Sequence, residues 1–168
     1  KEVDAAIADY ETALALRQMK NILEAAESSG IRKIIYTSSM STIGRSGKKL
    51  ADEDSPYDPS HFQGLYYDIK YRMEQEALAA AKRGFPVTIV NPTGVFGDYD
   101  VKPTSGLFIV KVARRELPLI IDAKLNAVDV RDVAGAEIAA MKLGKVGRRY
   151  LLGGHNTTVL KLAQLIAR

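Results

Sequence analysis

The sequence predicts an α/β fold built on a parallel sheet, and three observations carry that prediction. Two short runs rich in β-branched residues, 31–37 and 86–91, have the length and composition of buried strands. Segments with apolar residues at helical spacing precede and separate these runs. Each run also leads into a loop of small hydroxyl residues and glycine, which is typical of the edge where parallel strands end and ligands bind.

The first half of the chain alternates predicted helices with predicted strands. Gly30 supplies a stop for the first helix, and Gly84 supplies one for the second. The acidic, proline-containing segment 50–62 follows neither period, so we predict a loop there. In chain order, the elements are a helix over 5–28, a strand over 31–37, a helix over about 65–82 and a strand over 86–91.

The second half begins with a long loop over 92–106 that is rich in glycine and proline. Loops of that length are usually functional. Asp132 is a good N-cap for the helix that we predict after it. The predicted elements are a helix over 107–116, strand-like runs over 117–121 and 127–130, a helix over 133–144, a strand over 148–154 and a helix from 158 to the end.

Composition and charge argue against several classes of protein. The 168 residues are 46% apolar and 26% charged, and no apolar run reaches the roughly 18 residues that a membrane span needs, so we expect a cytoplasmic globular protein. The net charge of +4 is spread over isolated basic pairs, so nucleic acid is not an expected partner. The chain has no cysteine, and His61 and His155 stand alone, so no metal site is expected.

The stretch GLYYDIKYRMEQ, residues 64–75, opens the second predicted helix and holds three tyrosines. Side chains four residues apart share a face of a helix, and of the three tyrosines only Tyr66 has a lysine at that spacing, Lys70. An ammonium beside a phenol lowers the tyrosine pKa from about 10, which suits the phenol for proton transfer. Taken alone, the same spacing also occurs on the surface of ordinary helices.

Two loops that follow predicted strands carry further chemistry. They are 37–44, with several hydroxyl side chains, and 91–97, with two glycines. Because the carboxyl ends of parallel strands meet at one edge of the sheet, we expect both loops at a ligand site there. The alternative is that both segments are only turns.

Taken in order, these motifs resemble the extended short-chain dehydrogenase/reductase family, also called the NAD-dependent epimerase/dehydratase family. Glu74, four residues after Lys70, also sits where that family often has glutamate. The segment DVKPTSG (100–106) is most similar to hopanoid-associated sugar epimerases, which are related to dihydroflavonol reductases. The matching segments are YTSSMSTIG (36–44), EDSPYDP (53–59), the Tyr66-x-x-x-Lys70 pair, NPTGVFG (91–97), VRDVA (130–134) and GRRYLLGG (147–154).

The resemblance implies the later half of a Rossmann-like doubly wound sheet. Residues 1–168 would form a single partial domain, with small C-terminal substrate-binding elements from about 98 onward. The implied activity is that of an NAD(P)-dependent oxidoreductase or epimerase, acting by hydride transfer at a carbinol or carbonyl carbon of a nucleotide sugar or a dihydroflavonol-like ketone. The alternative is a non-catalytic dinucleotide-fold binding or regulatory protein, or an inactive remnant.

The resemblance also implies roles for individual residues. Tyr66 would be the general acid/base, Lys70 would lower its pKa and hydrogen-bond the nicotinamide ribose, and Ser39 would hold the reacting oxygen. The other cofactor contacts would come from Thr37, Pro92 and Val95. Candidates to face the substrate are Ser41, Thr42, Thr93, Lys102 and Arg131, although Arg131 and Lys102 are also read as solvated surface cations.

One motif of the family is not found. Dinucleotide-binding members carry G-x-x-G-x-x-G between a first strand and helix, whereas GRSG (44–47) and GVFG (94–97) each hold only two glycines. We therefore expect the chain to begin after about the fourth strand of the family's fold. The strand over 31–37 would then have an unpaired edge. This predicts self-association through that edge or a helix pair, or cover by a rearranged N-terminal segment.

Overall fold

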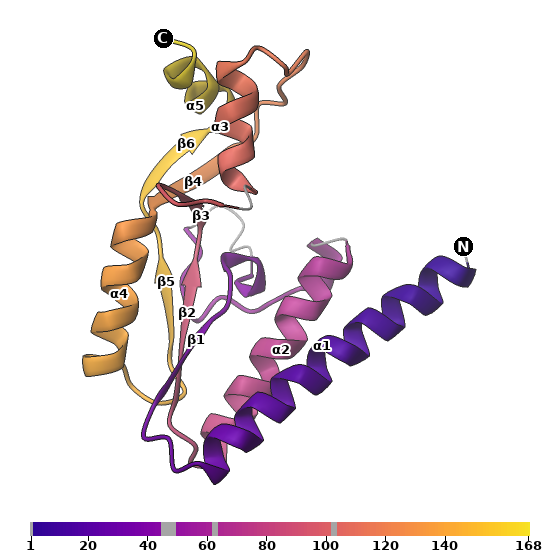
Figure 1. Ribbon diagram of the computed structural model, residues 1–168, viewed down its shortest axis with the longest axis vertical. Helices are drawn as coiled ribbons and strands as arrows, with labels where there is room; N and C mark the ends of the chain where they lie inside the picture. Colours follow the sequence, from indigo (N-terminus) through magenta and orange to yellow (C-terminus); the bar gives the residue numbers. More distant parts are fainter. Residues whose placement is uncertain (1, 45–49, 62–63, 102–103) are drawn as a thin grey trace. The chain divides into compact units, whose positions relative to one another are not determined.

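Figure 1 shows the computed structural model of the protein, which describes residues 2–44, 50–61, 64–101 and 104–168. The chain divides into two compact units. The first unit contains Lys1–Asn91 with Glu137–Leu151, and the second contains Pro92–Ala136 with Leu152–Arg168. Among the described residues, no helix is long and apolar enough to cross a membrane.

The first unit is built around a parallel pair of strands. β1 pairs with β2 with Ile34 opposite Val87 and Thr37 opposite Val90, and β5 lies on the other side of β2. Every residue of β2 is buried, as befits the central strand. The elements are α1 (Glu2–Ser28), β1 (Ile34–Thr37), the 3₁₀ turns η1 (Met40–Thr42) and η2 (Pro59–His61), α2 (Leu65–Lys82), β2 (Val87–Pro92), β5 (Arg149–Leu152) and the end of α4 (Val130–Leu143).

Helices α1 and α2 lie side by side and pack against the β1–β2 pair (Figure 1). The two buried alanines of α2 have short side chains, so the helix backbone approaches its neighbours closely. This packing fixes the position of α2, the helix that carries Tyr66 and Lys70. The buried core consists of Met19 and Leu23 from α1, Ala77 and Ala80 from α2, and Phe85, Val87 and Ile89 at and before β2.

The second unit has a mixed sheet in the order β3-β4-β6. β3 (Gly94–Phe96) runs parallel to β4 (Lys124–Asp129), whereas β6 (His155–Thr158) runs antiparallel to β4. The helices are α3 (Ser105–Ala113), the first part of α4, and α5 (Val159–Ile166), which contacts α3. A Cβ at Gly97 would lie 2.2 Å from Cγ1 of Val130, so glycine is required where the chain passes the start of α4.

The predicted α/β class with a parallel sheet is confirmed, and α2 has the predicted bounds. Some elements differ from the prediction. The loop predicted over 92–106 contains β3, and β6 was not predicted because a strand of four polar residues has no apolar alternation. The run 117–121 is not a strand; Leu119 and Ile121 are exposed, so no neighbouring strand buries them.

The start of α4 also differs from the prediction. The helix begins at Val130, so Asp132 lies in its first turn and is not the N-cap. Asp129 caps the helix instead, because its Oδ1 accepts a hydrogen bond from the backbone N–H of Arg131 at 2.8 Å.

β1 is an edge strand, because the order of its sheet is β1-β2-β5. Its neighbour on one side is β2, and Ser38 continues that pairing by donating its N–H to the carbonyl of Val90 at 2.8 Å. Within the described part of the chain, no strand pairs with the other edge of β1. The segment before it is the helix α1, so cover of this edge by a rearranged N-terminal strand is not observed.

Candidate active site

Ser39 lies just beyond the carboxyl end of β1, where the chain leaves the sheet. Its backbone is extended, with φ −160° and ψ 154°, and it caps the short turn η1. The cap is made by Oγ, which accepts a hydrogen bond from the N–H of Ser41 at 3.2 Å. The half-buried hydroxyl therefore has a fixed place, and its proton is not donated to any residue that the structure describes.

Tyr66 and Lys70 lie in the first turns of α2, four residues apart and on one face of the helix. Tyr66 is 55% exposed, so a ligand can reach its phenol. Lys70 is half-buried. Within the described part of the chain, neither the phenol of Tyr66 nor the ammonium of Lys70 forms a hydrogen bond, so both groups are available to a ligand.

The surroundings of the three neighbouring tyrosines distinguish them. The ring of Tyr71 stacks on that of Tyr57, with centroids 4.0 Å apart and 15° between the ring planes. This stacking attaches the acidic loop to α2. Tyr67 is half-buried and packs edge-on against Tyr66, with ring centroids 5.7 Å apart. Tyr66 is the exposed phenol of the three.

Tyr36, on β1, is a nearby phenol that sequence reasoning did not single out. Burial raises its pKa to about 12; the carboxylate of Glu74 and the phenol of Tyr66 act in the same direction, and the Ser38 hydroxyl opposes them. Tyr36 is therefore a neutral phenol at physiological pH. Its position three residues before Ser39 was the available signal in the sequence.

A buried polar network joins α2 to the loop that carries Ser39. Glu74 has no exposed surface, and its Oε2 accepts hydrogen bonds from Oγ1 of Thr42 at 2.7 Å and Nδ2 of Asn91 at 2.6 Å. Its Oε1 accepts a hydrogen bond from Nη1 of Arg149 at 3.3 Å. Sequence reasoning noticed Glu74 by resemblance and missed the roles of Asn91 and Arg149, because these partners lie 17 and 75 residues away along the chain.

The two η1 residues predicted to face the substrate are buried instead. Thr42 has no exposed surface, and besides Glu74 its hydroxyl reaches the carbonyl oxygen of Ser39 at 2.9 Å. Ser41 is 7% exposed, and its hydroxyl forms no hydrogen bond with the described residues. A substrate contact through Thr42 is therefore not supported, because protein atoms enclose the side chain. The structure gives Thr42 a part in holding the Ser39 loop.

Thr37, the predicted cofactor contact on this side, is the last residue of β1 and is exposed. Its Oγ1 donates a hydrogen bond to Oε1 of Glu137 at 2.8 Å. The hydroxyl proton is thus used within the protein, whereas the lone pairs of the oxygen remain open to a donor on a ligand.

Pro92, Thr93 and Val95 belong to the second unit. Pro92 is buried, and Val95 is half-buried in β3. The hydroxyl of Thr93 lies 2.8 Å from Oδ1 of Asn126 and 3.2 Å from the carbonyl oxygen of Leu152, so its single proton is used within the protein. Val95 is apolar and keeps exposed surface, as contact with a nicotinamide ring requires, whereas protein atoms enclose Pro92.

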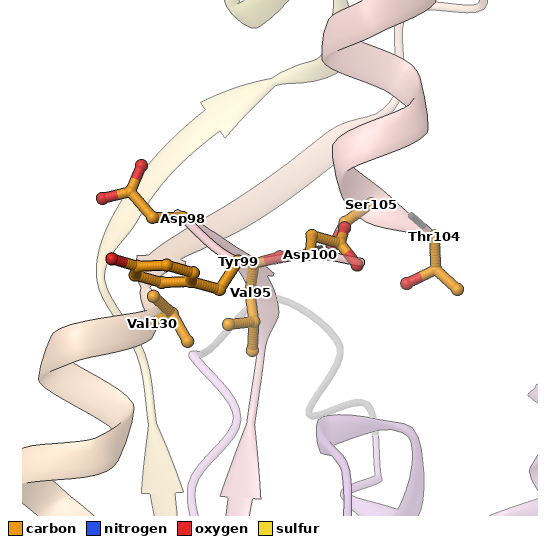
Figure 2. Close-up of a pocket in the computed structure, with 8 residues that line it drawn as sticks. Val95, Asp98, Tyr99, Asp100, Thr104, Ser105 and Val130 are labelled. Carbon is orange, nitrogen blue, oxygen red and sulfur yellow. Dashed lines mark hydrogen bonds between the residues drawn. The ribbon is translucent and has the colours of Figure 1, made fainter. Parts of the chain in front are cut away.

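The second unit contains a cavity of about 290 Å³ (Figure 2). Figure 2 shows the carboxylate of Asp100 beside Ser105, and that of Asp98 turned away from α3. Oδ2 of Asp100 accepts a hydrogen bond from the backbone N–H of Gly106 at 3.0 Å. It thereby pairs a donor in the first turn of α3. The cavity is lined by Val95, Gly97, Asp98, Tyr99, Asp100, Thr104, Ser105 and Val130.

Arg131, a predicted substrate contact, is engaged by its own helix cap. Its Nε and Nη2 donate to the two carboxylate oxygens of Asp129 at 2.9 and 2.7 Å. These hydrogen bonds from Arg131 lower the pKa of Asp129 to about 2, and Asp129 in turn raises the pKa of Arg131. The guanidinium remains exposed, so the structure presents it as a paired surface cation. Lys102, the other cationic candidate, lies outside the described residues.

Comparisons with known proteins show which family and which relatives this chain resembles. Residues 3–153 match the model of the NAD dependent epimerase/dehydratase family. Among curated proteins, a candidate dihydroflavonol 4-reductase of Synechocystis sp. is 40% identical over 146 residues, which cover 83% of this chain and 43% of that protein.

Two solved structures add to this comparison. A nucleoside-diphosphate-sugar epimerase from Pseudomonas aeruginosa is similar with a TM-score of 0.88 and 29% identity, over 94% of this chain and 53% of that one. The structure of Gre2 from Candida albicans in complex with NADPH has a TM-score of 0.73 and 27% identity, over 90% of this chain and 53% of that one. This chain therefore spans about half the length of the relatives that it matches.

Proposed function

The chain belongs to the NAD dependent epimerase/dehydratase family, and on that premise we propose that it supplies the proton-transfer groups of an NAD(P)-dependent oxidoreductase or epimerase. The reaction is hydride transfer at a carbon that bears a hydroxyl or carbonyl oxygen. One observation carries the proposal. An accessible phenol, Tyr66, lies one helical turn before the Lys70 ammonium, and their helix is tied through Glu74 to the loop that carries Ser39.

The proposed mechanism assigns one task to each of three side chains. In the reductive direction, Tyr66 donates its phenolic proton to the substrate oxygen as that oxygen gains negative charge. The Ser39 hydroxyl donates a hydrogen bond to the same oxygen and orients it. The Lys70 ammonium stabilises the phenolate that remains on Tyr66. In the oxidative direction, that phenolate takes the proton back from the substrate hydroxyl.

NAD(P) supplies the hydride when it is bound, and the described residues fit such a cofactor. The ammonium of Lys70 forms no hydrogen bond within the described chain, so its protons are available for ribose hydroxyls. Thr37 keeps its oxygen lone pairs open at the exposed end of β1. Of the two apolar residues that the family resemblance suggested here, we propose that Val95, which keeps exposed surface, faces the nicotinamide, and that buried Pro92, the last residue of β2, supports that strand.

We propose a substrate that carries several hydroxyl groups, either a nucleoside-diphosphate sugar or a dihydroflavonol. The names of two relatives support these two classes. A reductase makes one hydride transfer, whereas an epimerase removes the hydride and returns it to the opposite face of the carbon.

We also propose that the protein self-associates, through the free edge of β1 or through α1. The edge strand supports the first route, because unpaired backbone groups favour pairing with another chain. Exposed apolar residues on α1 support the second, namely Ile7, Tyr10, Leu14 and Ile22. Sedimentation velocity at increasing protein concentration tests the proposal. A species that stays monomeric at every concentration contradicts it.

The function is tested first by calorimetric titration of NADH and NADPH into the product of the complete gene. We expect binding of at least one of them in the micromolar range, followed by turnover of dihydroquercetin with NADPH or of UDP-glucose with NAD. Absence of binding by both cofactors contradicts the proposal. Binding without turnover of any sugar-nucleotide, flavonoid or other carbonyl probe favours the non-catalytic alternative.

A further inference from the structure

We propose that Glu74 is a positioning residue for Ser39. Its buried carboxylate couples α2, the helix of Tyr66, to the backbone of the Ser39 loop. This inference rests on the proposed function, because the positioning matters only if Ser39 and Tyr66 act on one substrate oxygen. Glu74 itself has no exposed surface, so it acts through other residues and does not touch the substrate.

The carbonyl oxygen of Ser39 is the point at which this loop is held. It accepts hydrogen bonds from the N–H of Thr42 at 3.2 Å and from Nδ2 of Asn91 at 3.1 Å. Oγ1 of Thr42, whose one proton is donated to Glu74, lies 2.9 Å from the same oxygen. Donors from two segments therefore meet at one backbone oxygen. Because the hydroxyl of Ser39 is attached to the same residue, the place of that hydroxyl depends on these donors.

Glu74 orients the side chains of the two residues that supply those donors. Its Oε2 lies 2.7 Å from Oγ1 of Thr42 and 2.6 Å from Nδ2 of Asn91, and these two atoms lie 2.9 Å from each other. Hydrogen bonds to a carboxylate are shorter and stronger than those between neutral groups. The carboxylate is therefore the strongest acceptor in the cluster, and it fixes the two side chains that hold Ser39.

The position of Glu74 on α2 connects this cluster to the proton donor. Glu74 follows Lys70 by four residues and Tyr66 by eight, so the three side chains lie along one face of the helix. A movement of α2 that displaces the Tyr66 phenol also displaces the acceptor of Thr42 and Asn91. The positions of the Tyr66 phenol and of the Ser39 loop therefore both depend on the same helix, α2.

Arg149 holds the carboxylate from the side of β5. Its side chain is 17% exposed, and its Nη1 lies 3.3 Å from Oε1 of Glu74. Nη2 of Arg149 donates to the carbonyl of Glu53, whose own carboxylate accepts the N–H of Leu151 at 2.9 Å. The guanidinium is therefore anchored, and it compensates the buried negative charge on Glu74.

The first test is a double-mutant cycle that joins Thr42→Val to Ser39→Ala, assayed with whichever of dihydroquercetin and UDP-glucose turns over. We expect Thr42→Val to lower kcat about 10-fold or more, because small displacements of a catalytic group are costly. Thr42→Ser keeps the hydroxyl and should restore kcat. In the Ser39→Ala background, Thr42→Val should have almost no further effect. Additive losses in the cycle overturn the proposal.

A matched control separates positioning from a general loss of stability. Thr88 is also fully buried, and its hydroxyl donates to the carbonyl of Lys145 at 3.2 Å, with no contact to the Ser39 loop among its hydrogen bonds. Thr88→Val removes a comparable hydroxyl from the same unit, so it should leave kcat within about 2-fold of wild type. An equal loss of kcat in Thr42→Val and Thr88→Val contradicts positioning.

The second test does not depend on activity. Amide hydrogen exchange of residues 38–44 should quicken about 10-fold or more in Glu74→Gln, and in Thr42→Val if the first variant does not fold, but not in Thr88→Val. Unchanged exchange in this segment overturns the inference whatever the enzyme does. If Ser39→Ala turns over normally, the proposed function fails instead, and the exchange measurement still decides whether Glu74 holds the loop.

Discussion

Two carboxylate–guanidinium pairs, one in each unit, differ in a way that distance alone does not reveal. Asp129 and Arg131 approach to 2.7 Å, whereas Glu74 and Arg149 lie 3.3 Å apart. The side chains of the first pair are 36% and 80% exposed, and those of the second are 0% and 17% exposed. Water screens the shorter pair, so the longer and buried pair is the one on which stability depends.

The two pairs also differ in what surrounds them. Asp129 and Arg131 are two residues apart and serve one helix end. Glu74 and Arg149 join α2, β2, β5 and the Ser39 loop, through Thr42 and Asn91. A local pair can be lost with only local consequences. A pair that connects several segments transmits its loss to every group that those segments carry.

The largest expected effect is that of Glu74→Ala. We expect it to lower the free energy of unfolding by about 3–5 kcal/mol, because the mostly enclosed guanidinium of Arg149 would be left without its partner. Urea denaturation followed by far-UV circular dichroism measures this loss. The double variant Glu74→Ala/Arg149→Met should recover much of it. A loss below about 1 kcal/mol would show that burial does not set the two pairs apart.

A packing change in the second unit should have an intermediate effect. In Gly97→Ala, the new Cβ would lie 2.2 Å from Cγ1 of Val130, so the start of α4 must shift; we expect a loss of about 1–3 kcal/mol. Gly135→Ala, within α4, is the matched control because no atom lies within 4 Å of its Cβ, and it should stabilise by about 0.4–1 kcal/mol. Equal effects of the two variants on the urea midpoint would contradict this assignment.

The smallest expected effect is that of Asp129→Asn, and it should depend on pH and salt. The pKa of Asp129 is lowered to about 2 in the folded protein. Because the folded state binds the proton less tightly, the contribution of Asp129 is present above pH 4 and is lost as the pH falls from about 4 to 2. Thermal melts of wild type and variant should therefore differ slightly at neutral pH and converge near pH 2. A difference that grows in acid contradicts the sign.

The elements that local pattern determines could be predicted from the sequence. α2 and the four-residue spacing of Tyr66 and Lys70 follow from the helical period, and β1 and β2 follow from β-branched runs. β6 could not be predicted in this way, because its residues His155–Thr158 become a strand only by pairing with β4. The apolar run 117–121 shows the converse, since it finds no strand partner within the described chain.

The site could be predicted only in part, for the same physical reason. Ser39, Tyr66 and Lys70 belong to short motifs whose spacing is visible in the sequence. Glu74 is separated along the chain from its partners Thr42, Asn91 and Arg149 by 32, 17 and 75 residues. No local sequence pattern can therefore predict these contacts. The sequence predicted a substrate contact for Thr42, because its hydroxyl lies on a loop. In the folded chain that side chain is fully buried, which the sequence alone does not reveal.

The most direct test of the account is turnover by Tyr66→Phe in the product of the complete gene, beside Tyr67→Phe as the control. The Phe variant at 66 keeps the ring and removes only the phenolic hydroxyl, and with it the acidic proton. We predict a loss of kcat of at least about 100-fold, with cofactor affinity by calorimetry nearly unchanged and Tyr67→Phe close to wild type. Unchanged turnover in Tyr66→Phe would contradict the assignment of the proton-transfer group.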